Sequence, residues 1–303
     1  MPAALVACLA GLLLSHPHPA LGQSIEPRAY SNAPIGTNFL IAGYAATSGG
    51  LAFDTALPLT DPDLETSSLI LAYARALDLW GKSGKIDMIV PYTDLSGTAR
   101  FDGDPVERDV TGFADPLVRM SVNLLGAPAL DPVAFRSYRQ DLIVGVSLQV
   151  SVPAGQYNET RLVNLGMNRW SFKPEIGASK ALGPWTIEGQ ASVTLFTDNN
   201  EFFNDREREQ EPLYQVQTHA IYNFRPGVWG SLDATYFTGG RTTLDDVVRN
   251  DLQRNWRLGA TLSLPLSARN SFRLYASRGV SARTGNNFDL VGAAWQYRWG
   301  ADP

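Results

Sequence analysis

The most regular feature of the chain is an alternation of apolar and polar residues with a period of two. In the stretch 255–266, Trp256, Leu258, Ala260, Leu262 and Leu264 alternate with Asn255, Arg257, Gly259, Thr261 and Ser263. The stretches 142–152 and 185–195 repeat this pattern. Successive side chains of a strand point to opposite faces, so each stretch predicts a strand with one apolar face and one small, polar face.

Twelve such strands can be placed after residue 36, where helix periodicity is weak. They are centred near residues 41, 72, 89, 121, 147, 174, 190, 219, 233, 260, 275 and 294. Each is about 10–12 residues long, which is enough to cross a bilayer at a tilt. We expect an all-β fold, a single closed antiparallel transmembrane β-barrel of about 12 strands. Because the region 36–80 alternates poorly, ten or fourteen strands stay open, and a soluble β-sandwich is the alternative.

The connections between these strands alternate in length. Short ones lie at 81–84, 181–183, 225–227 and 267–270, and long ones at 47–66, 94–115, 153–167, 197–211 and 239–252. Short turns at one end and long loops at the other are typical of outer-membrane barrels. Two connections depart from the pattern: 127–139 is long where a turn is expected, and 281–287 is short where a loop is expected.

Aromatic residues gather at the ends of the apolar faces, and the last strand is the richest in them. Aromatic rings favour the interface between membrane and water. Trp295, Tyr297 and Trp299 alternate with Gln296 and Arg298. Together with Gly292, these three aromatics are similar to the C-terminal signal by which outer-membrane barrels are inserted. We expect the last strand to pair with the first and to face lipid with its rings.

The N-terminus predicts an export signal. Residues 4–14 are apolar, and Ala20-Leu21-Gly22 fits a small-x-small cleavage site, although residues 1–22 contain no Lys or Arg. We expect a signal peptide at 1–22 and a barrel domain at 23–303. A lipoprotein box at 5–8 and a buried N-terminal helix are the alternatives. Cys8 is the single cysteine, so cleavage leaves no thiol for a disulfide, a nucleophile or a metal.

Charge excludes some partners and marks candidate lumen residues. The chain of 303 residues carries 25 basic and 30 acidic residues, a balance that gives no basic footprint for nucleic acid. Charged residues and one histidine on the polar faces are expected to line the lumen: Arg119, Arg169, Lys173, Glu175, Glu188, His219, Asp233, Arg257, Arg273 and Arg298. They predict either ion pairs that fill the barrel, such as Asp233 with Arg257, or a polar solute path that favours anions such as aromatic carboxylates.

Catalytic and metal chemistry find little support in the pattern. His219 is the only histidine beyond the predicted signal peptide, and a hydrolase would pair it with Ser192 or Ser231. We expect a hydrogen-bonded lumen histidine instead, and therefore no catalytic residues. The acidic residues between 197 and 212 fit no calcium-loop spacing, so an external, solvated loop is expected and no metal.

The chain resembles a family of outer-membrane proteins labelled as meta-pathway phenol-degradation proteins, often called simply transporters. The similar stretches are 151–203, 208–224, 232–242, 262–267 and 278–300, together with Gly81-Lys82, Pro91-Tyr92 and 112–116. The resemblance covers nearly all of the chain after the predicted signal peptide. It implies an outer-membrane barrel and a link to the breakdown of aromatic compounds, without defining a solute.

These observations lead to one functional hypothesis. We expect a channel or facilitator for small organic solutes in the outer membrane of a Gram-negative bacterium, possessing no enzymatic activity and no cofactor. The expected partners are outer-membrane lipid, the barrel-assembly machinery and a small-molecule solute, with no nucleic acid. A structural or adhesive barrel that transports nothing, and a lipid-modifying enzyme, are the alternatives.

Overall fold

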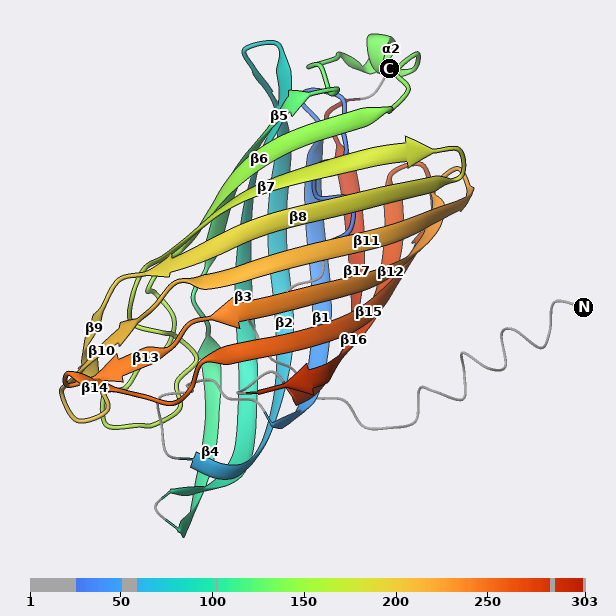
Figure 1. Ribbon diagram of the computed structural model, residues 1–303. Helices are drawn as coiled ribbons and strands as arrows, with labels where there is room; N and C mark the ends of the chain where they lie inside the picture. Colours follow the sequence, from blue (N-terminus) through green and yellow to red (C-terminus); the bar gives the residue numbers. More distant parts are fainter. Residues whose placement is uncertain (1–25, 51–58, 102, 284–286, 302–303) are drawn as a thin grey trace, which may run out of the picture.

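The chain forms a closed, tilted β-barrel with extensions at one end (Figure 1). The computed structural model describes residues 26–50, 59–101, 103–283 and 287–301. The predicted signal peptide lies outside these residues. No helix in the described part of the chain is long and apolar enough to cross a membrane.

The barrel wall follows the order of the chain. Its strands are β1 (Asn38–Gly50), β2 (Leu59–Leu79), β3 (Lys82–Phe101), β4 (Asp104–Phe113), β5 (Leu117–Leu125), β6 (Leu142–Ser151), β7 (Ser171–Leu182), β8 (Trp185–Phe196), β11 (Leu213–Arg225), β12 (Val228–Gly239), β15 (Gln253–Pro265), β16 (Asn270–Ala282) and β17 (Asn287–Trp299). All neighbouring pairs are antiparallel, and β17 pairs with β1 over Asn38–Trp299 to Gly50–Asn287, which closes the wall.

The thirteen wall strands occupy twelve positions. β4 and β5 both pair with β3, β4 along Tyr92–Phe101 and β5 along Gly84–Ile89, so they form one strand broken at residues 114–116. The prediction of a twelve-stranded antiparallel barrel is therefore confirmed, including the poorly alternating region at 36–80. In a closed wall, each strand of this region pairs with a strand on both sides. Backbone hydrogen bonds therefore hold it in place although its apolar and polar residues do not alternate regularly.

The connections confirm the predicted polarity but correct several predicted loops. Tight connections follow β2, β7, β11 and β15, at the same end as Asn38 and Trp299. The predicted loops at 47–66 and 94–115 are too long, because β1, β2, β3 and β4 cover residues 47–50, 59–66, 94–101 and 104–113. Residues 51–58 and 102 of these predicted loops lie outside the described residues. These strands extend beyond the membrane, where their outer face meets water instead of lipid, so the outward apolar pattern stops while the backbone pairing continues.

Two other predicted loops contain a small second sheet. Residues 197–211 and 239–252 hold β9 (Asn199–Phe202), β10 (Arg206–Gln210), β13 (Thr242–Leu244) and β14 (Val247–Val248), which pair in the order β14-β13-β10-β9. In Figure 1 this sheet lies at the lower left, beyond the ends of β8, β11 and β12. At the opposite end, the long connection between β5 and β6 carries the short helix α2 (Pro132–Phe135).

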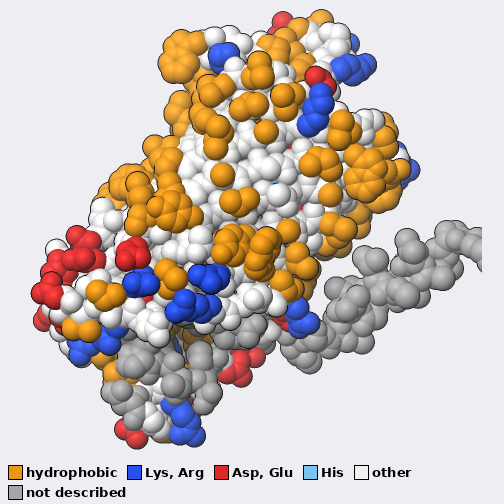
Figure 2. All heavy atoms as spheres, viewed as in Figure 1, with side chains coloured by type: hydrophobic (Ala, Val, Ile, Leu, Met, Phe, Trp, Pro, Cys, Tyr) orange, Lys and Arg blue, Asp and Glu red, His pale blue; other side chains and the backbone are white. Residues whose placement is uncertain are grey.

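The two faces of the wall are as predicted. Large apolar side chains are exposed on the outside, among them Leu71, Met88, Leu148, Ile176, Ile187, Val216, Leu232 and Leu258. Their polar neighbours point inward and are buried, as Asn255, Arg257 and Ser263 do on β15. Figure 2 shows apolar side chains across the middle of the molecule and charged side chains mostly toward its ends. This is the surface of a barrel that sits in a lipid bilayer.

Candidate functional site in the barrel lumen

The segment 26–37 runs from the start of β1 into the lumen. Tyr30, in the middle of this segment, is only 3% exposed. The segment is joined to the end of the barrel that carries the short turns, because Ile35 N donates to the Leu130 carbonyl oxygen and Gly36 N to that of Ala76. Asn32 also donates to the carbonyl oxygen of Pro128. The long connection after β5 therefore holds this segment through hydrogen bonds. This role explains why the connection is long where a short turn is expected.

Tyr30 sits in a recess made by two paired glycines. Gly145 on β6 lies opposite Gly177 on β7. A Cβ atom at Gly145 would come within 2.3 Å of the Tyr30 ring, and one at Gly177 within 2.2 Å. The Tyr30 hydroxyl donates to Glu175 Oε1 at 2.9 Å. The absence of side chains at these two positions thus creates the space that holds the ring against the wall.

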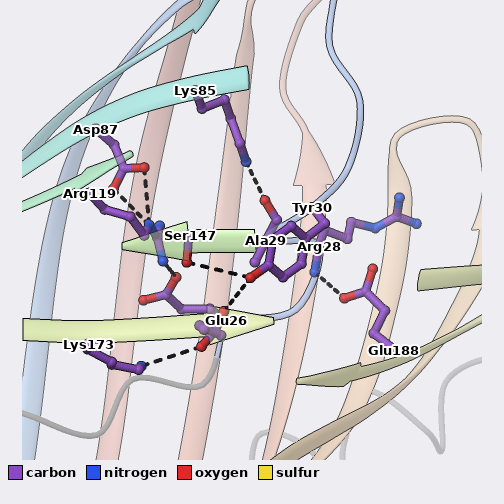
Figure 3. A network of polar contacts seen from close by, with 11 residues as sticks. Glu26, Arg28, Ala29, Tyr30, Lys85, Asp87, Arg119, Ser147, Lys173 and Glu188 are labelled. Atoms are coloured by element: carbon purple, nitrogen blue, oxygen red, sulfur yellow. Dashed lines mark hydrogen bonds and ion pairs between the residues drawn. The ribbon is translucent and has the colours of Figure 1, made fainter. Parts of the chain in front are cut away.

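A cluster of four ionisable groups surrounds the start of the segment (Figure 3). Arg119 on β5 forms ion pairs with Glu26 of the segment and with Asp87 on β3. The distance from Arg119 Nε to Asp87 Oδ1 is 3.1 Å. Lys85, also on β3, donates to the carbonyl oxygen of Ala29. Opposite charges largely neutralise each other here, which is what burial of charged groups requires.

Arg28 attaches the segment to the opposite wall. Its backbone N–H donates to Glu188 Oε2 on β8 at 2.6 Å, and its guanidinium donates to the Asn223 side chain on β11. The same guanidinium lies 4.9 Å from the centre of the Trp229 ring, which Arg273 approaches from 5.4 Å. Contacts on both sides mean that residues 26–30 cross the lumen rather than follow one wall.

A second buried polar group lies between β11 and β12. His219 Nδ1 is 2.7 Å from Asp233 Oδ1, and the two residues face each other in the strand register. Ser231 and Thr261 donate to the other carboxylate oxygen, at 3.1 and 3.3 Å. The Ser231 hydroxyl is thus directed to Asp233 and not to His219. Ser192 lies opposite Gln215 and not opposite the histidine. This arrangement is a hydrogen-bonded lumen histidine and does not form a nucleophile–base pair.

The loop end of the lumen contains further basic groups. Arg257 on β15 is fully buried, and it donates to Ser277 Oγ at 2.8 Å and to the Phe288 carbonyl oxygen at 3.2 Å. Arg169 is also buried; it donates to the Gln210 side chain and stacks over Phe196. The predicted pair of Asp233 with Arg257 does not match the register, in which Asp233 faces Gly259 and Arg257 faces Thr235.

The loop 152–170 folds against the inner face of the β3–β4 hairpin. Leu95, Val110, Val163 and Leu165 form a buried apolar cluster there with Ala114. Asp115, at the break between β4 and β5, accepts hydrogen bonds from Gly155 N at 2.9 Å and from Met167 N at 2.8 Å. One carboxylate thus fastens two separate parts of the loop.

The predicted lumen residues are distributed over the whole length of the barrel. Lys173 and Glu175 form a pair on β7, with 3.6 Å between Lys173 Nζ and Glu175 Oε2. Arg298 lies apart from the others: it is exposed at the turn end, where its Nε donates to the Ala268 carbonyl oxygen. It alternates with the outward-facing Tyr297 and Trp299 at the end of β17, and a lumen role for it stays a prediction. A role of the other residues in a solute path stays a prediction.

Residues that sequence reasoning missed include Glu26, Arg28 and Tyr30 in the segment and Lys85 and Asp87 on β3. For the strand residues a signal exists, because Lys85 and Asp87 alternate with the apolar Ile86 and Met88. The segment residues carry no periodic signal, since they precede the first strand.

The aromatic residues of the last strand lie on its outer face. Trp295, Tyr297 and Trp299 stack in a row, with ring centres 6.1 and 5.7 Å apart. Gly292 points inward and leaves space for the Tyr275 ring on the neighbouring strand. The expected insertion signal thus joins an outer aromatic row to an inner glycine, and its role in insertion stays a prediction.

Comparison with known proteins places this barrel among outer-membrane barrels. An outer membrane channel of Pseudomonas putida F1 matches with a TM-score of 0.78 and 19% identity, over 91% of this chain and 100% of the other. The transport unit of the autotransporter AIDA-I of Escherichia coli matches with a TM-score of 0.54 and 8% identity, over 91% and 93% of the two chains. At these identities the likeness concerns the fold.

A third similar structure is the β domain of the Bordetella autotransporter BrkA, with a TM-score of 0.52 and 13% identity over 87% of this chain and 100% of the other. A search of curated protein sequences finds no match. The family described as "Putative MetA-pathway of phenol degradation" matches residues 55–297, a range that ends in the last strand. The chain, an outer-membrane β-barrel, therefore belongs to this phenol-degradation family.

Proposed function

We propose that the protein is an outer-membrane channel for small organic solutes, and that the segment 26–37 controls passage through its lumen. The fold and the similar channel structure support the general function of a barrel channel. The family description links the chain to phenol degradation, which favours aromatic compounds as solutes. Export through a cleaved signal peptide belongs to the same proposal.

The crossing of the lumen by residues 26–30 is the observation that carries the proposal. Polar contacts with Arg119, Lys85, Glu175 and Glu188 hold the segment, and a single ring, that of Tyr30, is seated in the wall. Water can replace such polar contacts when a segment leaves its place, whereas an apolar core would be exposed. In a barrel with a purely structural role, apolar packing in this position would stabilise the fold more than these polar contacts do.

The charges of the lumen favour anionic solutes. Among the lumen residues described above, basic side chains outnumber acidic ones, and in the wall Arg257 is buried and Arg273 half-buried. An excess of positive charge attracts anions and excludes cations. Replacement of both Arg257 and Arg273 by Gln is therefore expected to reduce the preference for chloride over potassium.

Conductance of the purified protein in planar bilayers tests the proposal, together with uptake of aromatic acids and phenols by liposomes. Gly177→Ala pushes against the Tyr30 ring, and Tyr30→Ala removes it, so both are expected to raise conductance several-fold. Gly189→Ala is the matched control, because a Cβ atom there meets nothing within 4 Å. Heat-dependent gel migration shows whether each variant still forms the barrel.

Two outcomes contradict the proposal. The wild type, Gly177→Ala and Tyr30→Ala could all remain folded and yet conduct no ions and take up no solute. In that case the protein is a structural barrel. If Gly189→Ala raises conductance as much as Gly177→Ala, the Tyr30 recess does not control the path.

A further inference from the structure

A cavity of about 280 Å³ lies at the loop end of the barrel, between the β3–β4 hairpin and the loop 152–170. The hairpin continues beyond the Tyr92–Phe113 ring pair, and its outer residues there are charged or polar and exposed, such as Asp94, Thr98 and Arg100. The cavity is therefore outside the membrane, on the face of the hairpin that continues the lumen wall. Its volume is near the lower end of the roughly 300–1,000 Å³ found for ligand pockets.

The wall of the cavity is largely apolar and includes two aromatic rings. Phe101 and Phe203 lie edge to face with ring centres 6.0 Å apart, and both line the cavity. Leu64 and Leu162 contribute aliphatic surface, and Leu64 is only 3% exposed. A flat apolar ring can pack against such a wall, because aromatic pairs prefer offset or edge-to-face contacts.

Two arginines supply positive charge at the same cavity. Arg108 Nε donates to the Val163 carbonyl oxygen at 2.9 Å and Nη1 to that of Asp109 at 3.2 Å, which fixes its guanidinium between hairpin and loop. Burial and the nearby charge of Arg161 both lower the pKa of Arg108. Glu107 also lines the cavity, yet within the described residues neither arginine forms an ion pair with a carboxylate.

We infer that this cavity binds a small aromatic carboxylate, the benzoate class, before it enters the lumen. The ring packs against Phe101, Phe203 and Leu64, and the carboxylate accepts hydrogen bonds from Arg108 and Arg161. Guanidinium groups match the planar geometry of a carboxylate, and the bonds are charge-assisted. As a capture site for transport the inference rests on the proposed function, although the binding itself is measurable without transport.

Equilibrium binding of benzoate to the purified full chain in detergent micelles tests the site. Benzoate is expected to bind at least tenfold more tightly than benzyl alcohol, which lacks the charge, and than acetate, which lacks the ring. Arg161→Gln should weaken benzoate binding about tenfold. Arg100→Gln is the matched control, because Arg100 is on the same hairpin but donates to Gly103 and does not line the cavity. Ala99→Phe, which fills the cavity from β3, should abolish binding in a chain that still migrates as a folded barrel.

The outcomes separate this site from the proposed function. Equal loss of affinity in Arg161→Gln and Arg100→Gln, unchanged affinity in Ala99→Phe, or no binding of benzoate overturns the site. Solute flux that persists in any of these cases leaves the channel proposal intact. Benzoate binding that depends on Arg161 and Ala99, combined with no flux of any solute, supports the site and contradicts the channel.

Discussion

At the scale of single residues, position on the wall decides which side chain is tolerated. Gly145 and Gly177 admit the Tyr30 ring, whereas Gly189 meets open space, although all three are glycines in neighbouring strands. Leu232 is 71% exposed, and its chain neighbour Asp233 is 3% exposed. Leu232 therefore faces lipid, and Asp233 faces the lumen.

The lipid-facing position of Leu232 leads to a prediction. Leu232→Arg places a charge near the middle of the bilayer and is expected to lower the free energy of unfolding by about 2–4 kcal/mol. Thr238→Arg, on the same face near the loop end of β12, should cost only about 0–1 kcal/mol. Urea unfolding of both variants in lipid vesicles measures the difference. Equal costs at the two depths would contradict the assigned membrane position.

At the scale of elements, the break between β4 and β5 organises the loop end of the barrel. In the described part of the chain β4 pairs with one strand, β3, and the loop 152–170 packs against the inner face of this hairpin. Asp115 stands at the break and joins the two halves of this loop through Gly155 and Met167. The irregularity in the wall thus positions the loop that forms one side of the cavity.

Removal of this carboxylate is expected to loosen the loop and leave the barrel intact. Each hydrogen bond to a charged group is worth about 1.5–3 kcal/mol. Asp115→Ala should therefore raise the rate of trypsin cleavage after the exposed Arg161 at least tenfold, while heat-dependent gel migration stays unchanged. Asp104→Ala, at the exposed tip of the hairpin, provides the control. Identical cleavage rates in the two variants would show that Asp115 does not hold the loop.

At the scale of the whole molecule, closure of the wall depends on the last strand. β17 pairs with both β16 and β1, and its outer face carries the aromatic row at the turn end. A second aromatic pair, Tyr236 with Trp256, lies on the outer face toward the loop end, with ring centres 4.9 Å apart. The two groups have similar exposure to lipid but different places in the chain.

This difference permits a test of the insertion signal. Replacement of Trp295 and Trp299 by Ala is expected to reduce the amount of folded barrel in the outer membrane several-fold, because the strand that closes the wall then lacks its interfacial anchors. Replacement of Tyr236 and Trp256 by Ala removes an equal number of rings elsewhere. Fractionation followed by gels with and without heating measures assembly. Similar losses in both variants would indicate a general effect of aromatic rings and no C-terminal signal.

The alternation of residues is sufficient to predict the barrel, the strand positions and the two faces of the wall. The reason is local: in a strand with lipid on one side and polar groups on the other, successive residues face lipid and lumen in turn and are apolar or polar accordingly. The charges at Glu188, Asp233 and Arg257 are found in this way, because each lies between apolar neighbours. The same local pattern fails in the β3–β4 hairpin, where the outer face meets water through residues such as Asp94 and Arg100, and apolar residues such as Leu95 and Val110 face inward against the loop 152–170.

The content of the lumen and the cavity at its mouth were decided only by the tertiary structure. Residues 26–30 precede the first strand, and their partners Arg119, Glu175 and Glu188 are about 90 to 160 positions away in sequence. The cavity likewise joins Leu64, Phe101, Arg161 and Phe203 from four separate segments. A closed barrel brings such distant segments together through its circumference and its loops, and neither periodicity nor spacing along the chain records which of them meet.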